Sequence, residues 1–177
     1  MGLDMCLFKA PRIGLSVNDM LLVDIAASRY IKSEKDLERI DLEYITQVKG
    51  ANRLKPYIHE EGLYHVYYSV FEEVFYWRKA NAIHRWFVNN VQDGVDDCGY
   101  YEVTKEQLQT LKDLVDLTLE NMFDAPNLLP TMEGFFFGGQ EYDEYYINYL
   151  KETSGIIRKI LKNTDFEKEM IIYTSSW

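Results

Sequence analysis

An amphipathic segment of helix length, residues 78–92, lies between two stretches that favour extended structure, and this arrangement constrains the fold most. Residues 63–77 are rich in Tyr, Val and Phe, which are common in strands. After the segment, the Asp93-Gly94 pair signals a turn, and residues 100–103 predict a short strand. A helix with one apolar face between two strands is expected to pack that face against a sheet.

The same alternation of strand-like and helix-like segments extends over the rest of the chain. Thr104 and Gln107 form a capping box, which predicts the start of a helix at residue 105. The order of segments predicts an α+β fold, a single globular domain over residues 1–177 with a mainly antiparallel sheet and about four helices packed against it. We expect further strands at residues 2–8 and 168–173, helices at 33–48, 105–122 and 141–162, helix or strand at 19–31, and strand or turn at 134–139.

Charge and composition exclude several classes of function. The 177 residues carry a net charge of −10, which argues against non-specific binding to nucleic acid because such binding needs a basic surface. No apolar run reaches membrane-spanning length, and the first residues do not form a signal peptide. Cys6 and Cys98 are too few for a disulfide scaffold, so a reduced, cytoplasmic setting is expected.

Polar side chains gather on one side of the expected helix at residues 78–92. Arg78, Asn81 and Arg85 share this side on a helical wheel. His84 lies at the border with the apolar face. In one interpretation, His84 bonds a backbone carbonyl at the edge of the core and the polar side is solvated. In the other, these side chains form a pocket wall, where arginine grips a phosphate or carboxylate and histidine transfers a proton.

A cluster of carboxylates follows this helix at Asp93, Asp96 and Asp97. Three carboxylates in a glycine-containing loop could bind a divalent cation or cap the next turn, and the EF-hand pattern is absent. His84, Cys98 and an aspartate could also form a nucleophile with its base and an orienting group, but an inert cysteine and a structural histidine are the more common arrangement. We assign no catalytic residue, metal ligand or cofactor. The residues expected to bind a ligand are Arg78, Asn81, His84, Arg85, Asp96 and Asp97.

Aromatic residues are concentrated in the last third of the chain. Residues 134–139 read GFFFGG, and three successive phenylalanines cannot all face one side of a strand. The tyrosines of the expected helix at residues 141–162 recur at helical spacing, which is typical of a core face. An exposed tyrosine or phenylalanine face could also form the interface of a homodimer.

Three blocks of the sequence carry a resemblance to a known family. The opening MGLDM, the block YWRKANAIHRWFVNNVQDGVDDC, and LLPT followed by GFFFGGQEYDEYY resemble a family of small uncharacterised proteins encoded by bacteriophages and prophages. The blocks cover about half of the chain, and residues 9–70 have no counterpart. The resemblance implies a protein made in the cytoplasm of a bacterial host, and it implies no particular activity.

The leading hypothesis is an accessory protein that binds and inhibits a host factor, such as a defence nuclease, without catalysing a reaction. An acidic surface can compete for a basic nucleic-acid channel.

Two alternatives remain open. One is a protein that binds a nucleotide or another small molecule with Arg78, Asn81, His84 and Arg85. The other is a metal-assisted hydrolase that uses His84 with the aspartates.

Overall fold

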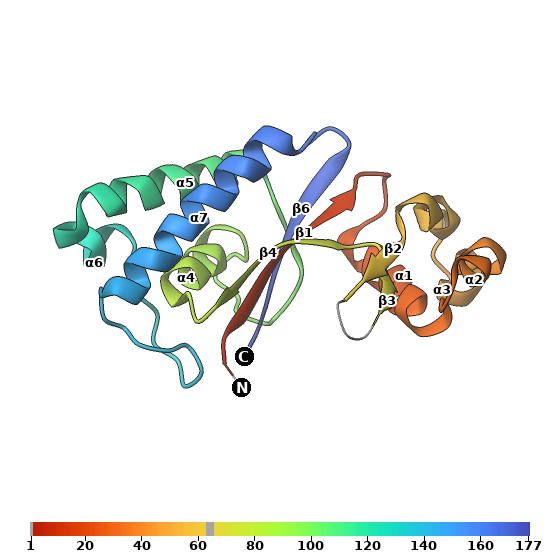
Figure 1. Ribbon diagram of the computed structural model, residues 1–177, viewed down its shortest axis with the longest axis horizontal. Coiled ribbons are helices and arrows are strands. Elements are labelled where there is room, and N and C mark those ends of the chain that lie inside the picture. Colours follow the sequence, from red (N-terminus) through yellow and green to blue (C-terminus); the bar gives the residue numbers. More distant parts are fainter. Residues whose placement is uncertain (1, 63–65) are drawn as a thin grey trace.

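A four-stranded antiparallel sheet forms the centre of the molecule, with helices on both of its faces (Figure 1). The structure is a computed structural model that describes residues 2–62 and 66–177, so the first residues of the strand expected at 63–77 lie outside it. The strands are β1 (Asp4–Pro11), β2 (His59–Glu61), β3 (Tyr67–Ser69), β4 (Glu72–Arg78), β5 (Tyr101–Val103) and β6 (Glu169–Ser176). The helices are α1 (Val17–Tyr30), α2 (Glu34–Arg39), α3 (Leu42–Thr46), α4 (Asn81–Asn90), α5 (Lys105–Glu120), α6 (Ala125–Leu128) and α7 (Glu144–Asn163), with short 3₁₀ helices η1 (Ala51–Tyr57) and η2 (Met122–Asp124).

The order of strands in the central sheet is β4-β1-β6-β5. Strand β1 pairs with β6 along its whole length, from Asp4 opposite Ser176 to Pro11 opposite Glu169. The pairing of β1 with β4 shifts by one residue after Leu7, where the ladder contains an irregularity. Strands β2 and β3 form a separate hairpin. The expected α+β fold with an antiparallel sheet is therefore confirmed.

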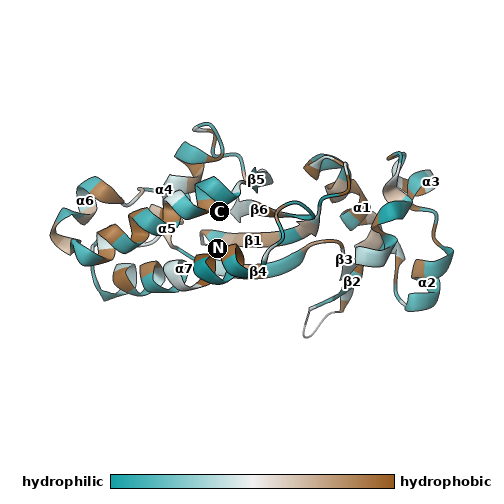
Figure 2. Ribbon diagram, turned by 90° about the horizontal axis from the view of Figure 1, so that it is seen from above, coloured by the Kyte–Doolittle hydropathy of each residue, from teal (hydrophilic) through white to brown (hydrophobic). Residues whose placement is uncertain are grey.

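Two hydrophobic cores lie on opposite faces of this sheet. Successive residues of β6 alternate between them, because successive side chains of a strand point to opposite faces. Ile171 and Tyr173 belong to the larger core, beneath α4, α5 and α7. Met170 and Ile172 belong to the smaller core, beneath α1 and η1. Figure 2 shows the two groups of helices at opposite ends of the sheet.

The two cores are also displaced along the strands. On β1 the larger core takes Met5 and Leu7, whereas the smaller core takes Ala10 with Phe8 packed against it. Each group of helices therefore covers only part of its face. The recesses described below lie on the uncovered part of each face, where polar and apolar residues are mixed.

Several helices begin and end where local sequence signals indicate. Thr104 accepts a hydrogen bond from the Gln107 amide, and the Gln107 side chain accepts one from the Thr104 amide, so the expected capping box starts α5. The ambiguous segment at 19–31 forms most of α1, which Ser16 and Asp19 cap in the same way. Residues 135–137 form a turn and not a strand.

The prediction of one helix over residues 33–48 is wrong. Ser33 caps α2, but this helix ends at Arg39 and Ile40 is extended. Asp41 then accepts a hydrogen bond from the Tyr44 amide and starts α3. An aspartate that caps a new helix competes with continuation of the old one. Among the described residues, α1, α4, α5 and α7 are the helices of ten residues or more.

None of the described helices combines the length and the apolar character needed to cross a lipid bilayer.

Candidate functional site

Asn81, at the start of α4, is buried and holds the loop that precedes α7. Its Nδ2 atom donates to the backbone oxygens of Phe137 at 3.1 Å and Gly139 at 2.8 Å. Its Oδ1 accepts from the Met132 amide at 3.3 Å. A buried amide with three backbone partners has little capacity left for a ligand. The side chain of Asn81 therefore acts as a clamp between α4 and residues 131–139.

His84 is fully buried in a network of side chains. Its Nε2 lies 3.0 Å from Asp96 Oδ2, and its Nδ1 lies 2.7 Å from the Tyr173 hydroxyl. Asp96 Oδ1 accepts a further hydrogen bond from the indole of Trp177 at 3.0 Å. An ionised Asp96 only accepts, which assigns the imidazole proton to Nε2 and makes Tyr173 the donor to Nδ1. Burial lowers the pKa of His84, and the contact with Asp96 opposes this shift in part.

The same network bears on the two catalytic hypotheses. Both nitrogens of His84 are occupied, so the imidazole has no free atom to activate Cys98. Burial also raises the pKa of the Cys98 thiol, which disfavours the nucleophilic thiolate. Across the described residues, no group of three or more His, Cys, Asp or Glu side chains could hold a metal ion.

The two arginines of the expected site point to different places. Arg78 is exposed, and its guanidinium lies 3.9 Å from Asp4. Arg85 is exposed and donates to the backbone oxygen of Thr131 at 2.9 Å. Asp97 accepts hydrogen bonds from the Gly99 amide and the Tyr101 hydroxyl, which is the capping role considered for this loop. Of the six residues expected to bind a ligand, His84 and Asp96 contact each other. This contact lies inside the protein, where His84 is fully buried.

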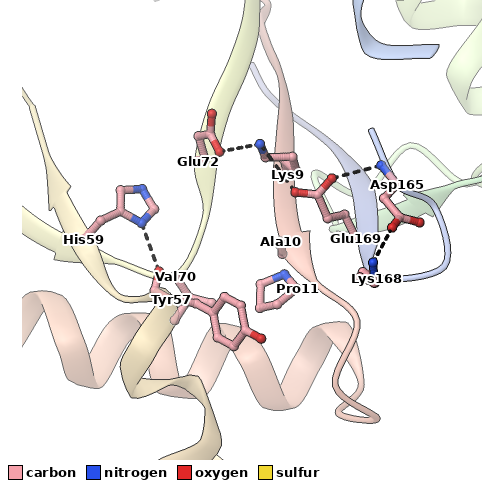
Figure 3. Close-up of a pocket in the computed structure, with 10 residues that line it drawn as sticks. All are labelled: Lys9, Ala10, Pro11, Tyr57, His59, Val70, Glu72, Asp165, Lys168 and Glu169. Carbon is pink, nitrogen blue, oxygen red and sulfur yellow. Dashed lines mark hydrogen bonds and ion pairs between the residues drawn. The ribbon is translucent and has the colours of Figure 1, made fainter. Parts of the chain in front are cut away.

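A recess of about 420 Å³ lies where the smaller group of helices meets the sheet (Figure 3). It occupies the end of the sheet face that α4, α5 and α7 leave uncovered. Strands β1 and β6 form one wall, and η1 and β2 form the other. We call it the junction recess, and its lining residues are Lys9, Ala10, Pro11, Tyr57, His59, Val70, Glu72, Asp165, Lys168 and Glu169.

Lys9 lies between two carboxylates of the junction recess. Its Nζ is 2.8 Å from Glu72 and 3.6 Å from Glu169. The hydrogen bond with Glu72 outweighs the effect of burial and raises the pKa of Lys9. The other carboxylate oxygen of Glu169 accepts from the Asp165 amide at 3.1 Å. Figure 3 shows this chain of charges running across the top of the recess.

The remaining charges of the recess are paired as well. Lys168 lies 2.9 Å from Asp165, and this hydrogen bond lowers the pKa of Asp165. His59 contacts the Tyr57 backbone oxygen and the Glu61 carboxylate. The lining therefore carries three carboxylates and two lysines, and both lysines already have carboxylate partners.

This pairing determines which ligands the junction recess favours. An incoming phosphate would have to displace a carboxylate from a lysine and would face the carboxylates that remain. An ammonium or guanidinium group would instead meet free oxygen lone pairs on Glu72 and Glu169. Pro11, Val70 and the half-exposed ring of Tyr57 add apolar surface beneath the charges.

Comparisons of this chain with protein-family models, with curated proteins and with solved structures found no match.

A second recess of about 320 Å³ lies on the uncovered part of the opposite sheet face and contains both cysteines, Cys6 and Cys98. The Cys6 sulfur lies 3.8 Å from Glu73 Oε2. Burial, with a smaller contribution from the Glu73 charge, raises the pKa of Cys6 to about 12. The Cys6 side chain is therefore a neutral thiol and not a nucleophile at physiological pH.

The residues of the junction recess were not among those expected from the sequence. Lys9 and Glu72 are brought together by the pairing of β1 with β4, and Glu169 by the pairing of β1 with β6. Both pairings join segments far apart in the chain. The strand-like character of residues 2–8 and 168–173 was visible, but the register that places these charges side by side was not.

Proposed function

We propose that this protein is a non-enzymatic binding protein that docks onto a basic region of a partner protein. The observation that carries this proposal is the junction recess, where Glu72, Asp165 and Glu169 lie above an apolar floor. A partner arginine or lysine could bind these carboxylates while its neighbours pack on Tyr57 and Pro11. The net charge of −10 would steer a basic partner toward the protein.

The resemblance to phage-encoded proteins supports a bacterial host protein as the partner. A host protein that binds nucleic acid, such as a defence nuclease, has the basic surface that this proposal requires. Binding of an acidic protein over such a surface would inhibit the host factor by excluding its nucleic acid.

The alternatives have less support from the described residues. A nucleotide site built from Arg78, Asn81, His84 and Arg85 would need these side chains to converge, and two of them are buried with protein partners. A hydrolase that uses His84 and Asp96 would need access to a fully buried imidazole.

Affinity capture from a bacterial lysate, quantified by mass spectrometry, tests the proposal. Three baits are compared: the wild-type protein, the recess variant Glu72→Gln/Glu169→Gln, and the control variant Glu120→Gln/Glu133→Gln. The control removes the same charge from two exposed carboxylates that lie outside the recess. Any difference between the two variants therefore reports on the recess and not on net charge.

We expect the wild-type and control baits to retain the same basic protein at low salt. The recess variant should retain about tenfold less, because it loses two charge-assisted contacts. The proposal fails if no protein is retained at low salt, or if the recess and control variants retain equal amounts.

A further inference from the structure

A small pocket of about 240 Å³ lies beside the first turns of α7 and shares no lining residue with the junction recess. Three tyrosine rings, two carboxylates and one glycine line it: Tyr145, Tyr146, Tyr149, Glu141, Asp143 and Gly139. The helical spacing of the tyrosines places their side chains on adjacent turns of α7. We refer to this site as the tyrosine pocket.

The rings of the tyrosine pocket stand at steep angles to one another. Tyr145 and Tyr149 have their centroids 5.7 Å apart with an interplanar angle of 76°. Tyr146 and Tyr149 are 5.2 Å apart at 66°. Rings at such angles meet at a corner, where Tyr145 supplies the exposed ring face and the two buried rings form the back of the pocket. Tyr145 is 53% exposed, while the other two rings are buried and held in place by the larger core.

The hydroxyl of Tyr149 is buried beside the Ala82 amide at the start of α4 and donates to no acceptor among the described residues. The neighbouring hydroxyls are satisfied, since Tyr145 donates to the Arg78 backbone oxygen and Tyr146 to that of Leu129. Burial raises the pKa of Tyr149 and the contact with the Ala82 amide opposes this shift in part, so its side chain is a neutral phenol whose proton is available to an acceptor. A buried hydroxyl that donates to no acceptor destabilises a protein unless a ligand or water completes its hydrogen bonding.

The charges around the tyrosine pocket are mainly negative. Asp143 accepts from the Tyr146 amide through one carboxylate oxygen, and its other oxygen has no partner among the described residues. Glu141 is exposed and makes no hydrogen bond or ion pair with any other described residue. The charge of Glu152 also acts on Tyr145. Two cations lie near the pocket: the Arg78 guanidinium points toward Asp4, and the Lys79 side chain lies along Gly138.

We propose that the tyrosine pocket binds an organic cation, an alkylammonium or guanidinium group. The face of a tyrosine ring attracts a cation, and cages of aromatic rings with a carboxylate are well suited to ammonium groups. The carboxylates of Glu141 and Asp143 exclude anions from the same place. A volume of 240 Å³ lies below the roughly 300–1,000 Å³ of sites for drug-sized ligands, which suits a single head group or side chain.

Two sources could supply this cation: a small molecule with an ammonium group, or a lysine or arginine side chain of a partner protein. Titrations followed by amide resonances in NMR distinguish them. The probes are choline, its neutral isostere 3,3-dimethylbutanol, N-acetyl-lysine methylamide and N-acetyl-arginine methylamide. Choline binding alone indicates a small molecule, and stronger binding of a blocked amino acid indicates a protein side chain.

We expect at least one cationic probe to shift the resonances of Gly139 and of the first turn of α7, and the neutral isostere to leave them unchanged. The variant Tyr145→Leu should weaken binding on the order of tenfold, because it removes the exposed ring face but keeps apolar bulk. Glu141→Gln should weaken binding by a smaller factor. Tyr44→Leu is the matched control, since Tyr44 is 77% exposed and lies on α3.

The variant Tyr149→Phe keeps the ring and removes only the buried hydroxyl, so it separates hydrogen bonding from the attraction of the ring. Equal shifts with choline and 3,3-dimethylbutanol would overturn the proposal, as would unchanged cation binding in both Tyr145→Leu and Glu141→Gln. Because these probes do not involve the junction recess, failure here leaves the proposed docking function to its own test.

Discussion

The Nε2 atom of His84 lies 3.0 Å from Oδ2 of Asp96, and the imidazole is fully buried. The carboxylate is in turn bonded to the indole of Trp177, so this pair joins α4, the loop after it and the last residue of the chain. The ring of Phe137 stands edge-on to His84 at 5.1 Å. A buried histidine in such a network couples the protonation of one side chain to the stability of the whole fold.

The pKa of His84 predicts how stability depends on pH. Burial lowers this pKa in the folded state, so the unfolded chain binds a proton more readily below about pH 6.5. Stability is then unaffected by His84 at higher pH and falls as the pH drops, with a slope of up to about 1.4 kcal/mol per pH unit. Urea denaturation between pH 5 and pH 8 measures this slope.

The variant His84→Gln provides the comparison for this experiment. It cannot titrate, so the free energy of unfolding should lose the part of its pH dependence that lies between pH 5 and 6.5. Aspartate and glutamate side chains contribute to the pH dependence of stability mainly at lower pH. Identical slopes in the wild-type and variant proteins would show that His84 has the same pKa in both states.

Replacement of Asn81 tests its role as a clamp on residues 131–139. Asn81→Ala removes three hydrogen bonds and leaves backbone groups of this loop without partners. We expect a loss of about 2–4 kcal/mol in the free energy of unfolding. Asn89→Ala, on an exposed position of the same helix, should change stability by less than about 0.5 kcal/mol. Equal effects of the two replacements would contradict the clamp.

The sequence supported prediction of elements whose signals are local. The capping box at Thr104 and Gln107 and the apolar periodicity of residues 105–122 and 141–162 depend on neighbours along the chain. These signals gave α5 and α7 within a few residues. The prediction of one helix over residues 33–48 failed because Asp41 is compatible with two roles. Asp41 could sit on the solvated face of a long helix or cap a new one, and its bonds to Tyr44 and Asn52 favoured the second.

The candidate sites depend on contacts between distant residues, which local patterns do not contain. The helical wheel placed Asn81 on a polar side that was expected to be solvated or to line a pocket. The loop at 131–139 instead covers it, because this loop offers three backbone groups that bond Asn81. Likewise, Lys9 meets Glu72 and Glu169 only through the register of the central sheet.

The thiol of Cys6 should be unusually unreactive. With its pKa raised to about 12, on the order of one Cys6 side chain in ten thousand is a thiolate at pH 8. Iodoacetamide labelling followed by mass spectrometry should therefore modify Cys6 far more slowly in the folded protein than in urea. Glu73→Gln removes a charge that opposes ionisation and should accelerate labelling. Folded-state labelling of Cys6 at the rate seen in urea would contradict the shift.

Two glycine replacements should change stability in opposite directions. A Cβ atom on Gly134 would lie 2.6 Å from the ring of Phe137, which is buried against His84 and Trp177 and cannot move aside. Gly134→Ala should therefore lower the free energy of unfolding by about 1–3 kcal/mol. A Cβ atom on Gly155, within α7, meets nothing within 4 Å.

Gly155→Ala should raise the free energy of unfolding by about 0.5–1 kcal/mol, because alanine restricts the unfolded chain and favours the helix. Thermal and urea denaturation of both variants measure the two effects under the same conditions. A neutral Gly134→Ala would mean that the turn at 134–139 adjusts to the added methyl group. That result would contradict the inference that Phe137 is held firmly against His84 and links this turn rigidly to the buried network.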